Sequence, residues 1–240
     1  KRQVLIPSQC PRCDGTLSID GAFLKCGNTN CPARVVRSLL YWCRFHEIDG
    51  IGDKLAAQLV ESKLVTNISD LYRLSIDDIM SLERMGRKSA SHITTQIHGK
   101  TRMPLHRFLA ALGLPRIGPE IASLISSRIG TIDNLQVMIE SWIDNDDNSH
   151  RQLEELVKID GIGEVVARLF LDGVSSAWQS TTDLASILEI TETILESEGT
   201  GPLDGKTFCI TGTLTRPRKE IELLIKSSCL LYTSDAADEP

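Results

Sequence analysis

Apolar residues recur at intervals of three and four along most of the chain, the spacing that predicts amphipathic helices. Leu55, Leu59 and Val60 show this spacing in one segment, and Ser, Thr or Asp residues that can cap a helix precede many others. We expect helices at residues 34–45, 53–62, 69–73, 76–82, 87–97, 105–112, 119–128, 135–143, 151–158 and 164–174. Residues 34–197 are therefore predicted to form an all-α domain.

A short frame returns four times between these helices. It reads apolar, any residue, Gly, apolar, Gly, and an alanine follows four residues after the last glycine. Two copies share the pentapeptide Ile-Asp-Gly-Ile-Gly, whereas in the other two Arg84 and Arg116 replace the first glycine. The copies are 48–52 with Ala56, 82–86 with Ala90, 114–118 with Ala122, and 159–163 with Ala167. Such a repeat predicts small helical units rather than one large sheet.

Each part of the frame has a physical reason. Two glycines let the backbone reach positive φ in a tight turn and let a phosphate or another backbone approach closely. The residues that follow predict a helix start, whose unpaired N–H groups and positive end form a small anion site. The frame resembles the helix-hairpin-helix DNA-binding motif, whose glycine amides hold a phosphate of duplex DNA. A helix C-cap glycine followed by another helix would explain one copy equally well, but it explains four copies less well.

The net charge of −6 conceals an uneven distribution of charge. Residues 1–46 carry 7 basic and 2 acidic side chains, and residues 84–116 carry 7 basic side chains and no acidic one. A basic block over the second hairpin that reaches the third is typical of a surface that follows phosphates, although a solvated helix face can also carry such a run. We expect the second hairpin, with Arg84, Arg87 and Lys88, to hold phosphate best. Charge reversal at Arg87 and Lys88 is expected to weaken duplex binding and flatten its salt dependence.

The cysteines near the start of the chain have metal-ligand spacing. Cys10 and Cys13 form one pair, twelve residues separate them from Cys26, and four more separate Cys26 from Cys31. Four thiolates can converge on a tetrahedral zinc ion and leave no position for water, so the predicted Zn²⁺ is structural. Disulfides or unrelated core cysteines are the alternatives. The residues between the pairs predict a two-strand hairpin that turns at Asp20-Gly21.

The C-terminal part of the chain follows a different pattern. Residues 198–202 are predicted to be a linker, and residues 203–214 predict a turn, a buried strand and a glycine-containing turn before a helix at about 217–226. This order resembles the opening of a BRCT domain, whose Thr-Gly-Thr segment can help to form a phosphate pocket. From Cys229 the sequence departs from that pattern, so we expect residues 203–240 to be a partial BRCT domain with an aberrant tail.

The chain contains, in this order, a predicted zinc unit, four hairpins and the opening of a BRCT domain. This order of modules resembles the C-terminal half of a bacterial NAD-dependent DNA ligase over residues 1 to about 228. The resemblance implies that residues 1–8 end an upstream OB domain, that residues 9–33 are a four-cysteine zinc finger, and that the domain that binds NAD and adenylylates a lysine lies upstream. It also implies nick sealing with Mg²⁺, and a nicked duplex gripped through its backbone phosphates. The fragment itself would hold neither NAD nor Mg²⁺ and would be inactive. The expected DNA-binding residues are Gly50, Gly52, Lys54, Arg84, Gly86, Arg87, Lys88, Arg116, Gly118, Gly161 and Gly163.

Other functions are less well supported by the sequence. A non-enzymatic DNA-repair scaffold built from the same modules is the alternative, and an upstream OB domain with an adenylylation lysine would exclude it. Lys158-Ile-Asp-Gly matches the short motif in which ligases carry nucleotide on lysine, but the repeat already explains its Asp-Gly. The histidines show no metal or triad spacing, and surface positions are expected for them. No apolar run approaches the ~20 residues that span a bilayer. We expect a cytoplasmic bacterial protein, monomeric and without membrane contact; without an initiator Met, the chain is interpreted as beginning inside a longer protein.

Overall fold

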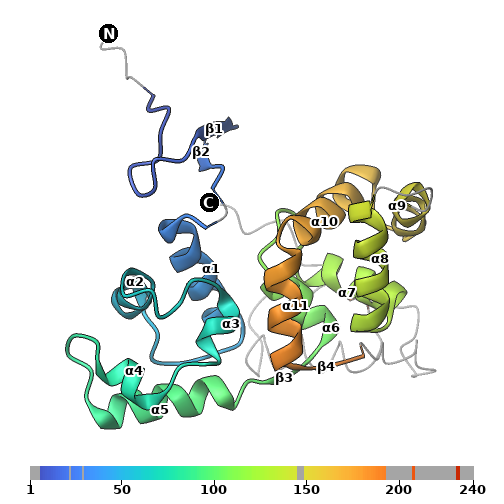
Figure 1. Ribbon diagram of the computed structural model, residues 1–240. Helices are drawn as coiled ribbons and strands as arrows, with labels where there is room; N and C mark the ends of the chain where they lie inside the picture. The colour runs from blue at the N-terminus through green and yellow to red at the C-terminus, as the bar shows by residue number, and fades with distance from the viewer. Residues whose placement is uncertain are drawn as a thin grey trace. The chain divides into compact units, whose positions relative to one another are not determined.

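The computed structural model describes residues 6–21, 23–28, 30–144 and 149–192, together with 207–208 and 231–232. The chain divides into two compact units, Lys1–Thr193 and Ile194–Pro240. The first unit is mainly helical, as predicted (Figure 1). Among the described residues, no helix has both the length and the apolar character needed to cross a bilayer.

The first unit begins with a small antiparallel hairpin. Strands β1 (Leu17–Asp20) and β2 (Phe23–Cys26) pair with Asp20 opposite Phe23, so the chain turns at Gly21, which has φ +61°. The hairpin is the one predicted from Asp-Gly, because glycine reaches positive φ without steric cost. It is too small to have a core of its own, and its strand residues Ile19, Phe23 and Leu24 are exposed.

Helices make up most of the rest of the unit. The first tandem of hairpins consists of α1 (Pro32–Phe45), α2 (Asp53–Glu61), α3 (Ile68–Leu71), α4 (Ile76–Met80) and α5 (Arg87–His98). The second tandem consists of α6 (Leu105–Ala111), α7 (Pro119–Ile129), α8 (Ile132–Asp144), α9 (Ser149–Val157) and α10 (Glu164–Ser176). The helix α11 (Trp178–Ile187) follows, and it was not predicted from the sequence. The ten predicted helices are present, with ends that differ by a few residues.

Trp42 lies at the centre of the first tandem. Its side chain is fully buried, and its indole Nε1 donates a hydrogen bond to the Tyr72 hydroxyl at 2.9 Å. Its ring also meets the Phe108 ring of α6 edge to face, with centroids 6.2 Å apart. Burial of these aromatic rings joins the first tandem to α6 of the second, since each ring removes a large apolar surface from water.

Two further contacts join the tandems. Strand β3 (Arg102–Pro104), which connects α5 to α6, pairs in parallel with β4 (Glu189–Thr191), which follows α11. The guanidinium of Arg73, just after α3, binds the Asp183 carboxylate of α11 through both nitrogens, at 2.6 and 3.0 Å. The short sheet of β3 and β4 was not predicted, because three-residue strands carry almost no periodic signal.

The second unit is described only at two points. Strands β5 (Thr207–Phe208) and β6 (Leu231–Tyr232) pair in parallel over two residues. The predicted strand of the BRCT opening therefore coincides with β5, and β6 falls in the predicted aberrant tail. The Thr-Gly-Thr segment, the helix at 217–226, the linker at 198–202 and the first five residues of the chain lie outside the described residues, so the BRCT and OB assignments stay predictions.

Candidate metal centre and nucleic-acid interface

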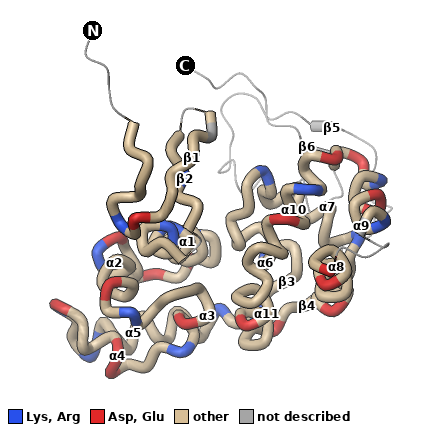
Figure 2. The backbone as a smooth tube through the Cα atoms, turned by 45° about the horizontal axis from the view of Figure 1, so that its top comes forward, with Lys and Arg blue, Asp and Glu red and all other residues tan. Residues whose placement is uncertain are grey.

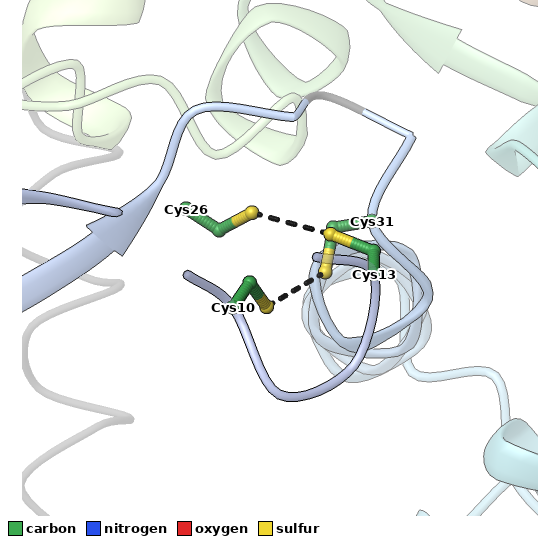
Figure 3. Close-up of side chains that lie close together, drawn as sticks. All are labelled: Cys10, Cys13, Cys26 and Cys31. Carbon is green, nitrogen blue, oxygen red and sulfur yellow. Dashed lines mark hydrogen bonds between the residues drawn. The ribbon is translucent and has the colours of Figure 1, made fainter. Parts of the chain in front are cut away.

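The four cysteines of the N-terminal hairpin converge as the sequence predicts. Their Sγ atoms all lie within 4.8 Å of one another, with Cys10 and Cys31 3.8 Å apart and Cys13 and Cys26 3.5 Å apart (Figure 3). A tetrahedral ion with metal–sulfur bonds of about 2.3 Å needs sulfur–sulfur separations of about 3.8 Å. The geometry of the cluster therefore fits a four-coordinate metal ion that prefers thiolates.

Backbone hydrogen bonds shape the loops that carry these thiols. The Cys10 carbonyl accepts from the Asp14 amide at 2.8 Å, and the Cys10 amide donates to the Gly15 carbonyl at 2.8 Å. A Cβ on Gly15 would stand 3.3 Å from the Cys13 Sγ and 3.4 Å from the Cys26 Sγ, so a side chain there would crowd the sulfurs. Only glycine leaves the cluster uncrowded at this position.

The pKa values of the cluster's thiols show that these groups do not ionise independently of one another. A backbone hydrogen bond at Gly15 and the neighbouring thiols lower the pKa of Cys13 to about 7. A backbone hydrogen bond at Asn28 acts to lower the pKa of Cys26, but desolvation and the neighbouring thiols outweigh it and raise that pKa to about 12. One thiolate thus suppresses ionisation of the next, and a bound divalent cation removes that conflict because it stabilises all four thiolates.

The four hairpins share one backbone conformation at the position of the first glycine. Gly50 and Gly161 have φ of +92° and +83°, and Arg84 and Arg116 both have φ of +63°. The two arginines therefore occupy the left-handed region, which is unfavourable for a residue with a Cβ. The looser copies of the frame are structurally equivalent to the exact copies.

The second glycine of each frame has a different conformation from the one expected. Gly52, Gly86, Gly118 and Gly163 are the N-caps of α2, α5, α7 and α10, with φ between −81° and −96°. The prediction that both glycines supply positive φ is wrong for this position, because the residue before the helix has an extended backbone. Any residue can adopt that conformation, so φ does not explain the glycine. In each hairpin the glycine carbonyl accepts from the amide of the frame's alanine at 2.9–3.0 Å, and all four alanines are fully buried.

No side chain of the described residues explains the second glycine. A Cβ built on any of these four glycines meets nothing within 4 Å, so neither φ nor packing requires the absence of a side chain. The first glycine is different, since a Cβ on Gly50 would lie 2.8 Å from Cγ1 of Ile93 in α5. The left-handed backbone at the first position thus serves the fold, and the second position leaves an open surface beside a helix N-terminus.

The charges beside these helix starts are unequal (Figure 2). The first two helical residues are Asp53 and Lys54 in α2, Arg87 and Lys88 in α5, Pro119 and Glu120 in α7, and Glu164 and Val165 in α10. All of these side chains are exposed. A carboxylate in the first turn competes with an external anion for the helix end. Of the four helices, α5 alone has no carboxylate in its first turn, which begins with two basic residues.

Tertiary contacts occupy part of the basic block at 84–116. Arg102 pairs with Glu189 at 3.2 Å, Lys100 lies 4.0 Å from Glu47, and the Arg107 guanidinium donates to the Phe45 carbonyl at 3.1 Å. Arg84 pairs with its exposed neighbour Glu83, a contact that water weakens. Across the part of the chain that the structure describes, no carboxylate pairs with Arg87, Lys88 or Arg116.

Two other sequence interpretations can be compared with the structure. The ammonium of Lys158 is largely exposed and binds the Glu155 carboxylate at 3.1 Å, and it precedes the fourth hairpin as the repeat predicts. The expectation of surface histidines is wrong for His46, which is 4% exposed at the end of α1 and packs on the Trp42 ring. Burial and the charges of Arg107 and Lys100 lower the pKa of His46 to about 4. Cys43 of the same helix is also buried, and burial raises its pKa to about 12.

Comparison with known families agrees with this geometry. A model described as a SAM-like helix-hairpin-helix tandem matches residues 44–98, and a helix-hairpin-helix motif model matches residues 107–182. The two matches coincide with the two structural tandems. The chain is thus a helix-hairpin-helix protein with a four-cysteine metal-type cluster at its start.

Curated relatives narrow the assignment. A DNA ligase of Coprothermobacter proteolyticus is 35% identical over 218 residues, which cover 90% of this chain and 30% of the relative. A DNA ligase of Methylacidiphilum infernorum is 31% identical over 92% of this chain and 31% of the relative, and one of Campylobacter hominis is 34% identical over 92% and 32%. The chain belongs to the DNA ligase family. It spans about a third of the length of these relatives.

Proposed function

We propose that this chain is the DNA-gripping C-terminal portion of an NAD-dependent DNA ligase that seals nicks in duplex DNA during replication and repair. The observation that carries the proposal is the set of second glycines, whose missing side chains face open space beside four helix N-termini. A glycine that neither the backbone nor the packing requires is explained by the close approach of an external group. At a helix N-terminus the favoured group is an anion, and in duplex DNA it is a backbone phosphate.

The contributions of the hairpins follow from their first turns. The second hairpin combines the open glycine Gly86 with Arg87 and Lys88, so it supplies amide donors and two cationic side chains to the same phosphates. The fourth hairpin places Glu164 at the equivalent position, where the Arg168 guanidinium binds it at 3.0 Å. The second hairpin is therefore the strongest of the four grips, and the fourth is the weakest.

Chemistry and grip are divided between parts of the enzyme in this proposal. The adenylylation lysine, the NAD site and the Mg²⁺ site belong to the part of the ligase outside this chain, and Lys158 is a surface residue of the fourth hairpin. Zn²⁺ is the ion proposed for Cys10, Cys13, Cys26 and Cys31, and its role when bound is to stabilise a hairpin that is too small to fold on apolar burial alone. The protein acts as a monomer in the bacterial cytoplasm.

A glycine-to-alanine exchange tests the grip. The Gly86→Ala variant adds a methyl group where the phosphate approaches, and its affinity for nicked duplex is expected to fall about tenfold, the loss of one hydrogen bond to a charged group. Its fold is expected to change little, because φ is −95° and the new Cβ meets nothing within 4 Å. Gly163→Ala is the matched control in the weakest hairpin and is expected to lose less. Equal affinity of Gly86→Ala and the parent in a gel-shift titration would contradict the proposed contact.

A second experiment tests the division of chemistry and grip. The chain is incubated with adenylate-labelled NAD and nicked duplex, and the expected result is DNA binding without label on the protein. Label on Lys158 would overturn the assignment of catalysis to another part of the ligase.

A further inference from the structure

Helix α1 is unusually basic for this acidic chain. Its fourteen residues include Arg34, Arg37 and Arg44 and no carboxylate, whereas the whole chain has a net charge of −6. Arg34 is already committed to the cysteine cluster, since its guanidinium donates to the backbone carbonyls of Cys26 at 3.1 Å and Asn28 at 3.4 Å. Arg37 and Arg44 are therefore the two arginines of α1 whose role the metal cluster does not explain.

These two arginines lie on one face of the helix with Tyr41 between them. Positions 37, 41 and 44 are separated by four and three residues, so their side chains follow one another along the same stripe. All three are exposed, and the opposite face carries the buried residues Leu39 and Trp42. We call Arg37, Tyr41 and Arg44 the α1 stripe.

The arginines of the α1 stripe have no acidic partner. Within the described parts of the chain, no carboxylate pairs with Arg37 or Arg44, although other exposed arginines such as Arg128 and Arg168 do bind glutamates. A chain with an excess of carboxylates that leaves two neighbouring guanidinium groups unneutralised presents a local positive potential. An anionic partner complements this potential.

Tyr41 places the stripe beside the third hairpin. Its hydroxyl donates a hydrogen bond to the Ala110 carbonyl of α6 at 3.3 Å. Its ring lies 3.3 Å from the position of a Cβ built on Gly113, which has φ +67° and directly precedes the third hairpin. The stripe thus lies where the first tandem meets the start of the third hairpin, whose tip carries the exposed Arg116.

We propose that the α1 stripe is a further contact for the sugar-phosphate backbone of the same duplex, between the grip of the first tandem and the third hairpin. This inference rests on the proposed function. Arg37 and Arg44 supply charge-assisted hydrogen bonds to phosphates, and the anchored Tyr41 ring offers a rigid surface to the sugar edge. The cysteine cluster supports the contact because Cys31 is the N-cap of α1 and Arg34 ties the first turn to the cluster.

A double variant tests the stripe. Arg37→Ala with Arg44→Ala is measured against nicked duplex over a range of salt concentrations. The slope of log affinity against log salt is expected to become shallower by about 1.8, because each phosphate contact contributes about 0.9. Arg102→Ala with Arg128→Ala removes the same charge from residues that bind Glu189 and Glu155, and it is expected to leave the slope unchanged. Circular dichroism and the unfolding midpoint establish that both double variants are folded.

The outcomes separate this inference from the proposed function. If Arg87→Glu with Lys88→Glu weakens binding while the stripe variant keeps the parental slope, the stripe inference is overturned and the hairpin grip stands. A stripe variant and a control that lose the same slope would also overturn it, since the effect would then reflect net charge alone. If the parent chain does not bind duplex DNA, the proposed function fails first.

Discussion

Replacement of Arg84 by glycine is expected to stabilise the chain and at the same time to weaken its grip on DNA. Arg84 has φ +63°, at the position where the first and fourth hairpins have glycine. A left-handed backbone costs a residue with a Cβ about 1–2 kcal/mol. Relief of this cost stabilises the glycine variant, but the greater conformational freedom of glycine in the unfolded chain offsets about 0.5–1 kcal/mol of that stabilisation. The free energy of unfolding should therefore rise by about 0.5–1 kcal/mol.

Arg87→Gly is the matched control three residues along the chain. It removes the same side chain from the same hairpin, but Arg87 begins α5 and has no left-handed strain to relieve. Its unfolding free energy should fall by about 0.5–1 kcal/mol, because glycine is a poor helix residue. Each variant should make the salt slope of duplex binding shallower by about 0.9, the contribution of one phosphate contact.

Denaturant unfolding and a salt titration of duplex affinity read out the two effects separately. The exposed pair of Arg84 with Glu83 adds little to the folded state, so its loss does not reverse the sign. The reasoning is refuted if Arg84→Gly destabilises the chain as much as Arg87→Gly does. It is also refuted if Arg84→Gly is more stable than the parent and its affinity for DNA has the same salt dependence, since the strained arginine would then make no phosphate contact.

Two further predictions concern the buried histidine and the metal cluster. The pKa of His46 is lowered from 6.5 to about 4, so below pH 6.5 the unfolded chain binds a proton that the folded chain does not. The free energy of unfolding should therefore be highest above pH 6.5 and fall by up to about 3 kcal/mol as the pH drops to 4. Unfolding midpoints across this range measure the loss, and His46→Leu should flatten it; an unchanged slope in that variant would assign the effect to other groups. A strong chelator, or Cys10→Ser, should release the Zn²⁺ proposed for the cluster, loosen the hairpin and the first turn of α1, and leave the buried core around Trp42 folded. Metal analysis with near- and far-ultraviolet circular dichroism checks this, and loss of the whole far-ultraviolet helical signal would contradict it.

The repeat and the cysteine spacing predicted most of the local structure. Periods of three and four located ten helices, because each helix buries one apolar face against the others. The Cys10–Cys13 and Cys26–Cys31 pairs predicted a convergent site, since short loops restrict where the thiols can lie. The strands β3 and β4 were missed, because pairing between segments that lie far apart in the chain leaves no periodic trace in either of them. The helix α11 was missed because one of its two buried residues is the polar Thr181, which weakens its apolar period.

The different roles of the two glycines in each frame could not be predicted from the sequence. The sequence established that glycine recurs, but not that the first position has positive φ and the second does not. Only the folded chain shows that a Cβ at Gly50 would collide with Ile93, whereas a Cβ at Gly52 would meet open space. The distinction between glycine for the fold and glycine for a partner needs the neighbours of each residue in three dimensions.

The sequence by itself determined the modules and their order, because apolar period, glycine frame and cysteine spacing are local properties of the chain. The tertiary structure decided which charges remain free. Lys100, Arg102 and Arg107 belong to an acid-free run of sequence, yet Glu47, Glu189 and the Phe45 carbonyl bind them. Arg37 and Arg44 lie outside that run and have no acidic partner among the described residues. Charges interact through space over a few ångströms, so the partners of a basic residue are fixed by the fold rather than by its neighbours in sequence.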